Sequence, residues 1–209
     1  MTNLFLEFKS FGWNATTIGL VGTIIFTIFQ AWGLTRQFKT IARKQSGKSI
    51  PVLLFSSFVG VYLAFGLYGY RIHSLAMIIN GLLGFLYLRV YIAAVQFPDS
   101  DGWKLWHALF LLLIPAMYYS THPQELLGII LFGATSLLLQ SPYEIFQKKS
   151  AGAVEPRFLA TFTASASFWI IYSIGIRDWV VFASNAIAVL VMIATFILWF
   201  KYKTAAQAA

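Results

Sequence analysis

Two asparagines in apolar surroundings are the side chains of this sequence best suited to binding chemistry. Asn80 and Asn185 are 105 residues apart (185 − 80 = 105), and Pro51 and Pro156 show the same spacing. An asparagine amide offers two donors and two acceptor lone pairs that lipid cannot satisfy. An internal repeat of this kind is typical of transporters that bind substrate between their repeats. We therefore predict that both asparagines line one cavity; the alternative is hydrogen bonds that only join neighbouring helices.

Trp169 has chemistry that complements the two amides. Its indole face is an apolar, polarisable surface for the C–H face of a sugar ring, while asparagine amides can reach the hydroxyl groups at the ring edge. Tryptophans often anchor a helix at the membrane interface instead, and those near segment ends fit that role. Trp169 lies well inside its apolar segment, so we predict that it lines the cavity and that the substrate is a neutral polyol.

The composition places these residues in a membrane protein. Hydrophobic residues make up 59% of the 209 residues and charged residues 11%, with a mean hydropathy of +0.74, which excludes a cytosolic enzyme. Seven apolar segments are each about long enough to cross a bilayer as a helix. They are Trp13 to Leu34, Val52 to Tyr70, Leu75 to Val95, Leu105 to Ser120, Leu126 to Phe146, Phe158 to Ile176 and Trp179 to Phe200.

The positions of the basic residues predict the orientation. The formal net charge is +8, and most basic residues fall in the loops after the first, third and fifth segments and in the C-terminal tail. These are Arg36, Lys39, Arg43, Lys44, Lys48, Lys104, Lys148, Lys149, Arg157, Lys201 and Lys203. Cytoplasmic loops carry such an excess, so we expect the N-terminus outside and the C-terminus in the cytoplasm. This distribution explains the charge without a nucleic-acid partner.

The segments group as three, one and three. We predict an all-α membrane protein with a first triple-helix repeat at 13–96, a linker transmembrane helix at 103–121 and a second repeat at 125–201. Three segments leave the chain on the opposite side of the membrane, so a second triplet of equal orientation needs one extra crossing. The two repeats are therefore expected to be parallel, related by an axis along the membrane normal.

Catalytic and metal chemistry find little support in this sequence. The chain has no cysteine and three histidines, which lie in different segments or loops without the helical i, i+4 spacing of a metal site. We predict no metal, no cofactor and no enzymatic activity.

The second half carries a known signature. Trp169-Ile170-Ile171-Tyr172, Arg177-Asp178 and Ser184-Asn185 resemble the pattern of the SWEET sugar transporters. The first half is similar but looser, with Tyr68-Gly69, Asn80-Gly81 and the basic loop from Lys39 to Pro51 of the wider PQ-loop (MtN3) superfamily. The resemblance implies a fold of two parallel triple-helix repeats and a substrate site that includes Asn80, Asn185 and Trp169.

The resemblance also implies hinge and gate residues. Family members have four prolines that kink the moving helices; Pro51, Pro142 and Pro156 match them, and Gln37 stands at the fourth position. Asp178 matches a family position that helps to close the extracellular gate by bonding a tyrosine of the first repeat. Tyr68 or Tyr62 is the expected partner, and a surface ion pair with Arg177 is the alternative.

The repeat offset assigns a second wall to the cavity. Subtracting 105 from 169 gives Ala64 as the counterpart of Trp169. We therefore expect Ala64 in the substrate site and an asymmetric cavity with one aromatic wall, roomy enough for a disaccharide.

The function predicted is a facilitator that moves small neutral sugars, mono- or disaccharides, by alternating access in the plasma membrane. Because no Asp or Glu lies in the middle of a segment, ion coupling is not expected. The alternatives are an amino-acid or vitamin transporter of the PQ-loop superfamily, or a non-transporting sorting receptor of the same fold. The partners expected are the sugar and membrane lipid, and whether copies associate into a homo-oligomer is left open.

Overall fold

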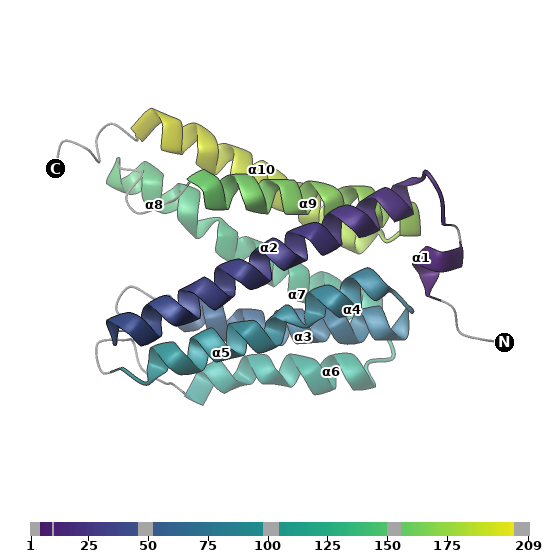
Figure 1. Ribbon diagram of the computed structural model, residues 1–209, viewed down its shortest axis with the longest axis horizontal. Helices are drawn as coiled ribbons and strands as arrows, with labels where there is room; N and C mark the ends of the chain where they lie inside the picture. Colours follow the sequence, from purple (N-terminus) through teal and green to yellow (C-terminus); the bar gives the residue numbers. More distant parts are fainter. Residues whose placement is uncertain (1–4, 10, 46–51, 98–104, 150–155, 203–209) are drawn as a thin grey trace.

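The protein is a bundle of long apolar helices (Figure 1). The computed structural model describes residues 5–9, 11–45, 52–97, 105–149 and 156–202, and no strand occurs among them. Helices over Ala15–Arg43, Val52–Arg71, Leu75–Val95, Leu159–Ile176 and Trp179–Tyr202 are long and apolar enough to cross a membrane, and two shorter apolar helices cover His107–Tyr119 and Pro123–Leu138. The all-α membrane fold is confirmed, whereas the domain boundaries 13–96, 103–121 and 125–201 stay a prediction.

The described residues of the first half of the chain form five helices. They are α1 (Leu6–Lys9), α2 (Ala15–Lys44), α3 (Val52–Arg71), α4 (Leu75–Gly81) and α5 (Leu83–Val95). Helix α2 starts at the N-cap Asn14, whose side chain accepts a hydrogen bond from the Thr17 N–H at 3.0 Å. It extends well beyond the predicted end at Leu34. Charged residues lower the hydropathy of this last part, but Leu34, Phe38 and Ile41 follow helical spacing and pack against α3 and α5 residues.

The described residues of the second half of the chain form one 3₁₀ helix and five α-helices. They are η1, a 3₁₀ helix (Leu105–Leu112), α6 (Leu113–Tyr119), α7 (Pro123–Leu138), α8 (Gln140–Lys148), α9 (Pro156–Ile176) and α10 (Trp179–Tyr202). The predicted segment from Leu126 to Phe146 is thus split near Leu139. Pro142 explains the split, because a proline has no N–H to donate to the carbonyl four residues earlier, at Leu138.

The helices pack in the same order in both halves. Helix α3 packs against α4 and α5, and α2 packs against α5; in the second half, α10 packs against both α9 and α7. In each half the helix that comes third along the chain therefore lies between the other two. The halves meet where α2 crosses α9 and where α3 contacts α7.

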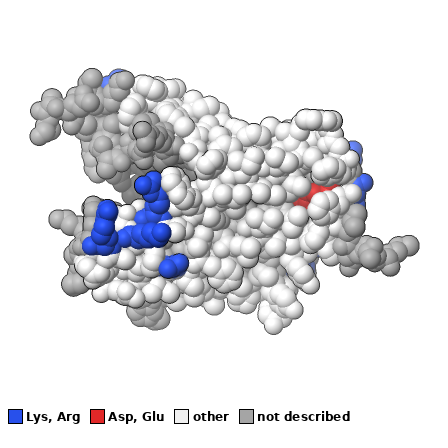
Figure 2. All heavy atoms as spheres, viewed as in Figure 1, with Lys and Arg blue, Asp and Glu red and all other residues white. Residues whose placement is uncertain are grey.

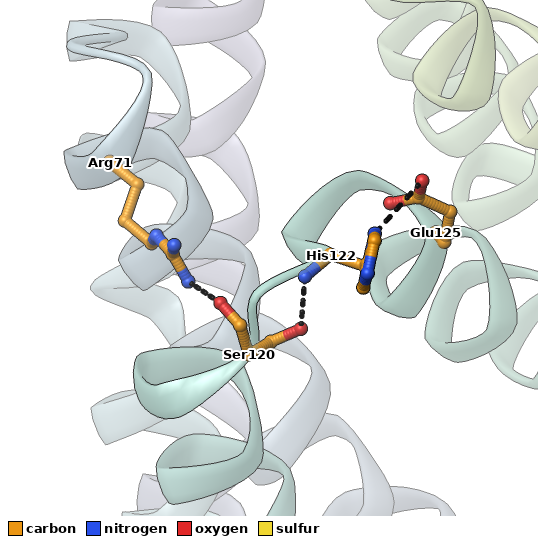
Figure 3. Close-up of polar contacts among 4 residues, drawn as sticks. All are labelled: Arg71, Ser120, His122 and Glu125. Carbon is orange, nitrogen blue, oxygen red and sulfur yellow. Dashed lines mark hydrogen bonds and ion pairs between the residues drawn. The ribbon is translucent and has the colours of Figure 1, made fainter.

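Helix α6 packs beside α3. Arg71, the last residue of α3, joins them: its Nη1 donates to the Ser120 carbonyl at 2.7 Å (Figure 3). The same nitrogen also donates to the Met117 carbonyl at 3.0 Å. The guanidinium thereby satisfies carbonyl groups at the C-terminus of α6, which have no partner within the helix.

Glycines bring α2 and α9 into close contact near the end of the bundle where α2 begins, here called the N-terminal end. A Cβ on Gly19 would lie 2.4 Å from the Tyr172 Cα, and one on Gly175 would lie 2.5 Å from the Thr16 nitrogen. Small residues allow helix backbones to approach in this way in membranes.

A layer of buried side chains fills the N-terminal end between the two halves. We call this layer the plug; it consists of six members of the buried core cluster, drawn from both halves: Leu20, Tyr68, Met77, Leu127, Tyr172 and Val181. The plug separates the N-terminal end from the cavity described next.

Basic residues gather at the opposite end of the face shown in Figure 2, over the C-terminal part of α2 and α5. Arg89 belongs to this region and is exposed, with its guanidinium 3.9 Å from the Phe38 ring centroid. It does not enter the space between the halves.

Candidate substrate cavity

A cavity of about 120 Å³ lies between the two halves of the molecule. Side chains of α2, α3, α4, α7, α9 and α10 line it: Gln30, Phe58, Val61, Tyr62, Phe65, Asn80, Leu131, Ala134, Thr135, Leu138, Phe162, Ser165, Ala166, Trp169, Ser184, Asn185 and Ala188. The structure thus brings three predicted site residues together, namely Asn80, Asn185 and Trp169. All lining residues are uncharged, so the cavity is suited to a neutral solute.

The cavity begins where the plug ends. On α3 and α9, which run toward the N-terminal end, the lining residues Phe65 and Trp169 precede the plug residues Tyr68 and Tyr172. On α10, which runs away from that end, Ser184 follows the plug residue Val181. The structure therefore represents a state in which the N-terminal end is closed.

Asn80 is held by the first half of the molecule. It is buried on α4, and its Nδ2 donates to the Thr27 hydroxyl of α2 at 2.8 Å. Its helix starts at Ser74, whose hydroxyl caps the Met77 N–H. The carbonyl oxygen of the Asn80 amide accepts no hydrogen bond from the part of the chain that the structure describes, so it can accept one from a solute hydroxyl.

Asn185 is held by its own helix. Its Nδ2 donates to the Val181 carbonyl of α10 at 2.8 Å, and Ser184 next to it also lines the cavity. The helix is fixed at its start by Asp178, which accepts hydrogen bonds from the Val180 and Val181 N–H groups at 3.1 Å. Both asparagines therefore have one amide N–H engaged within the protein and polar atoms left toward the cavity.

The aromatic wall differs from the prediction. Trp169 packs edge to face with Phe65, with ring centroids 5.1 Å apart, and both line the cavity. Ala64 is 0% exposed and is not among the residues that line this cavity, whereas its neighbour Phe65 is. The cavity has aromatic side chains from both halves, not from one.

The register of the repeat explains why Phe65 and not Ala64 lines the cavity. The structure pairs Phe65 with Trp169 (169 − 65 = 104), Tyr68 with Tyr172, and the N-cap Ser74 with the N-cap Asp178. Asn80 and Asn185 are 105 residues apart, so the offset changes by one residue between the cap and the asparagine. A constant offset cannot detect such a shift, and one residue turns a helix position by about 100°.

Gln30 and Thr135 are cavity residues that the sequence analysis missed. Gln30 donates from its Nε2 to the Ser165 hydroxyl at 3.2 Å, while its Oε1 is buried without a hydrogen-bond partner. Unpaired buried polar atoms are costly, so this oxygen is a candidate acceptor for a solute hydroxyl. The two residues are 105 apart in the sequence, a signal that could have identified them.

Asp178 binds one of its two expected partners. The Tyr68 hydroxyl donates to the Asp178 carboxylate at 2.7 Å, within the plug and between the halves. Tyr62 instead lines the cavity and stacks on Tyr87 with ring centroids 4.9 Å apart. The hydrogen bond between Tyr68 and Asp178 joins α3 to α10 at the closed end.

The four positions expected to act as hinges differ in where they lie relative to the helices. Pro51 lies outside the described residues, Pro156 is the first residue of α9, and Pro142 follows the break before α8. Gln37 lies in the unbroken part of α2. Because glutamine has the N–H that proline lacks, α2 stays continuous where its counterpart in the second half is interrupted.

The structure is a helical membrane bundle with a cavity between its two halves, an arrangement typical of transporters. Residues 125–207 match the family model MtN3_slv, described as "Sugar efflux transporter for intercellular exchange". The resemblance to the SWEET family is confirmed over this part of the chain.

A solved structure supports the fold over nearly the whole chain. A eukaryotic SWEET transporter determined at 3.7 Å resolution is similar to this chain with a TM-score of 0.69 and 16% sequence identity, over 90% of this chain and 96% of that one. At this identity the likeness establishes the fold alone. No curated protein matches the sequence.

Proposed function

We propose that this protein is a uniporter that moves small neutral sugars across the plasma membrane by alternating access. The observation that carries the proposal is the cavity between the halves, which is lined by the amides of Asn80 and Asn185 and by the rings of Trp169 and Phe65. A sugar has apolar C–H faces and hydroxyl edges, and this wall offers a surface for each. The family match over residues 125–207 supports a sugar as the substrate class.

The uncharged cavity wall supports sugars over the alternatives. An amino acid or a peptide tail carries charged groups, and burying a charge without a partner is strongly unfavourable. Within the described residues, neither a basic nor an acidic side chain lines the cavity. This argues against the amino-acid transporter and the sorting receptor.

Counterflow in liposomes tests the proposal. Purified protein, loaded with one unlabelled solute, is offered labelled hexoses, disaccharides and amino acids in turn. We expect exchange of at least one sugar and none of the amino acids. Exchange of amino acids alone would contradict the proposal.

Asn185→Ala tests the site. We expect it to reduce sugar exchange about tenfold or more, since a hydrogen bond to the solute is lost and a polar group is left unpaired. The matched control is Ser136→Ala on α7, whose hydroxyl bonds only the Gly133 carbonyl and is exposed. Equal activity of Asn185→Ala and wild type would remove Asn185 from the site.

The proposed orientation places the N-terminal end of the bundle outside the cell. It rests on the basic residues near the opposite end, such as Arg36, Lys39 and Arg43, and on the positive-inside tendency. The closed plug is then the extracellular gate, and the cavity belongs to an inward-facing or occluded state.

A further inference from the structure

Glu7 is a buried carboxylate that the transport site does not explain. It lies on the short helix α1, ahead of the first membrane-spanning helix, and is 0% exposed. The Ser74 hydroxyl and the Ala76 N–H donate to its Oε1 at 3.2 and 3.1 Å, and the Leu75 N–H donates to its Oε2 at 3.2 Å. The Tyr172 hydroxyl also donates to Oε1. Ionised carboxylates are buried only with such partners.

These partners come from both halves of the molecule. Ser74 and the two N–H groups belong to the start of α4 in the first half, whereas Tyr172 belongs to α9 in the second. The Tyr172 hydroxyl also lies 2.6 Å from the Ser74 Oγ. Glu7 therefore bridges the halves at the closed end, next to the plug.

The internal symmetry indicates what Glu7 replaces. Tyr68 of the first half bonds Asp178, the N-cap of α10, and the symmetry-related Tyr172 of the second half lies beside Ser74, the N-cap of α4, with both hydroxyls donating to Glu7. The N-cap Asp178 in the second half has a carboxylate, whereas the N-cap Ser74 in the first half has only a hydroxyl. Glu7 supplies the missing carboxylate from outside the repeat.

The backbone holds α1 in place for this contact. The Leu6 N–H donates to the His73 carbonyl at 2.9 Å, and His73 has a left-handed backbone conformation with φ of 57° in the turn between α3 and α4. Helix α1 is thus docked on the turn that carries Ser74.

We propose that Glu7 is a positioning residue of the gate, and that α1 is a latch that holds the N-terminal ends of the two halves together. The proposal rests on transport by alternating access. Opening of this end separates Tyr172 from Ser74, so it must break the bridge that Glu7 makes. Losing Glu7 then shifts the protein toward the state that is open at the N-terminal end.

Thiol labelling measures this shift without any substrate. The chain has no cysteine, so a single Thr135→Cys variant reports access to the cavity that Thr135 lines. A second variant, Thr121→Cys, in the exposed turn between α6 and α7, identifies the membrane side on which the N-terminal end lies. A membrane-impermeant thiol reagent is applied to each side in turn.

Glu7→Gln and Glu7→Ala are expected to change labelling of Thr135→Cys in opposite directions on the two sides. From the side where Thr121→Cys reacts, the labelling rate should rise about tenfold, the size expected when bonds to a charged group are lost. From the other side it should fall. A rise from both sides would mean general loosening of the fold and would overturn the proposal, as would unchanged rates.

The symmetry allows a rescue. Glu7→Ala combined with Ser74→Asp places a carboxylate at the N-cap of α4, as Asp178 does at α10, and should return labelling to within about twofold of wild type. Failure of this rescue in a folded protein would contradict the symmetric role. Glu125→Gln is the matched control, because Glu125 is an exposed carboxylate at the same end, 3.6 Å from His122 (Figure 3). It should leave labelling unchanged.

The labelling result and the sugar assay can fail independently. If labelling shifts as expected but no sugar is exchanged, the latch stands and the proposed substrate is wrong. If sugars are exchanged and labelling does not shift, the substrate proposal stands and the latch is wrong.

Discussion

Trp169 has two roles at once in this structure. It lines the cavity, and it is also 6% exposed within the hydrophobic core, where its ring contacts Phe65 and Tyr172. The sequence analysis treated it only as a cavity side chain. Truncation to alanine would remove core packing worth about 3–5 kcal/mol, so loss of transport in such a variant would not isolate the binding role.

Trp169→Phe separates the two roles. We expect sugar exchange to fall about tenfold, because the smaller ring gives less surface for the C–H face of the sugar, while the protein stays folded. Counterflow and thermal unfolding of the purified protein are the measurements. Trp179→Phe is the control. Trp179 is 63% exposed at the start of α10, so this variant should exchange sugar at the wild-type rate. Loss of exchange in both variants would point to stability and not to binding.

Phe65 lines the cavity beside Trp169, and we expect it to limit the size of the solute. Phe65→Ala should enlarge the cavity and favour a disaccharide over a hexose by about 1–3 kcal/mol in relative rate. Competition of each sugar against labelled hexose measures this ratio. Ala64→Trp, the change that the sequence register suggested, should instead disturb folding, because Ala64 has no exposed surface and overpacking costs about 1–3 kcal/mol. An unaltered ratio in Phe65→Ala would show that Phe65 does not set the size.

Among the elements, the helix termini were predicted best where a turn or cap residue marks them. Leu75 and Trp179 were expected as segment starts, and the structure begins α4 and α10 there, after the N-caps Ser74 and Asp178. The end of α2 was not predicted, because hydropathy falls at Arg36 while the helical spacing of buried residues continues. Composition therefore indicates which segment crosses the membrane, whereas the packing of side chains determines where the helix ends.

Gly19 is predicted to control the crossing of α2 and α9. Gly19→Ala places a Cβ 2.4 Å from the Tyr172 Cα, and a backbone atom cannot move aside without separating the helices. We expect a loss of thermal stability of about 1–3 kcal/mol. Gly33→Ala on the same helix is the matched control, since nothing lies within 4 Å of its added Cβ; it should be neutral or slightly stabilising. Equal effects of the two substitutions would mean that helix propensity and not the crossing matters.

The two halves pack tightly at the N-terminal end, and the cavity lies next to this closed end. The plug, the bond from Tyr68 to Asp178 and the bridge at Glu7 all lie at the N-terminal end. Toward the other end the ribbons of α8, α9 and α10 diverge from those of α3 and α5 (Figure 1). The proposed alternating access would require the halves to separate at the N-terminal end and to pack together at the opposite end.

Transport is predicted to be independent of proton and sodium gradients. The cavity wall carries no titratable side chain among the described residues other than the hydroxyl of Tyr62, and an intramembrane carboxylate usually serves ion coupling. Sugar uptake into liposomes should therefore equilibrate and not accumulate under an imposed pH or sodium gradient. Asn185→Asp is the informative contrast, because it adds a titratable group to the cavity and should make exchange vary with pH. Accumulation by wild-type protein would contradict the uniporter assignment.

The sequence by itself determined the membrane class and the helical fold, because hydropathy and repeat spacing are properties of the chain in order. It also predicted the two asparagines, Asp178 and Trp169 as site residues, and those assignments stay predictions. Only the tertiary structure decided that Phe65 and not Ala64 meets Trp169, since a one-residue change of register rotates a helix face without altering composition. Glu7 likewise could not be assigned from the sequence. Its partners Ser74 and Tyr172 lie far along the chain, and only folding brings all three together in a buried site.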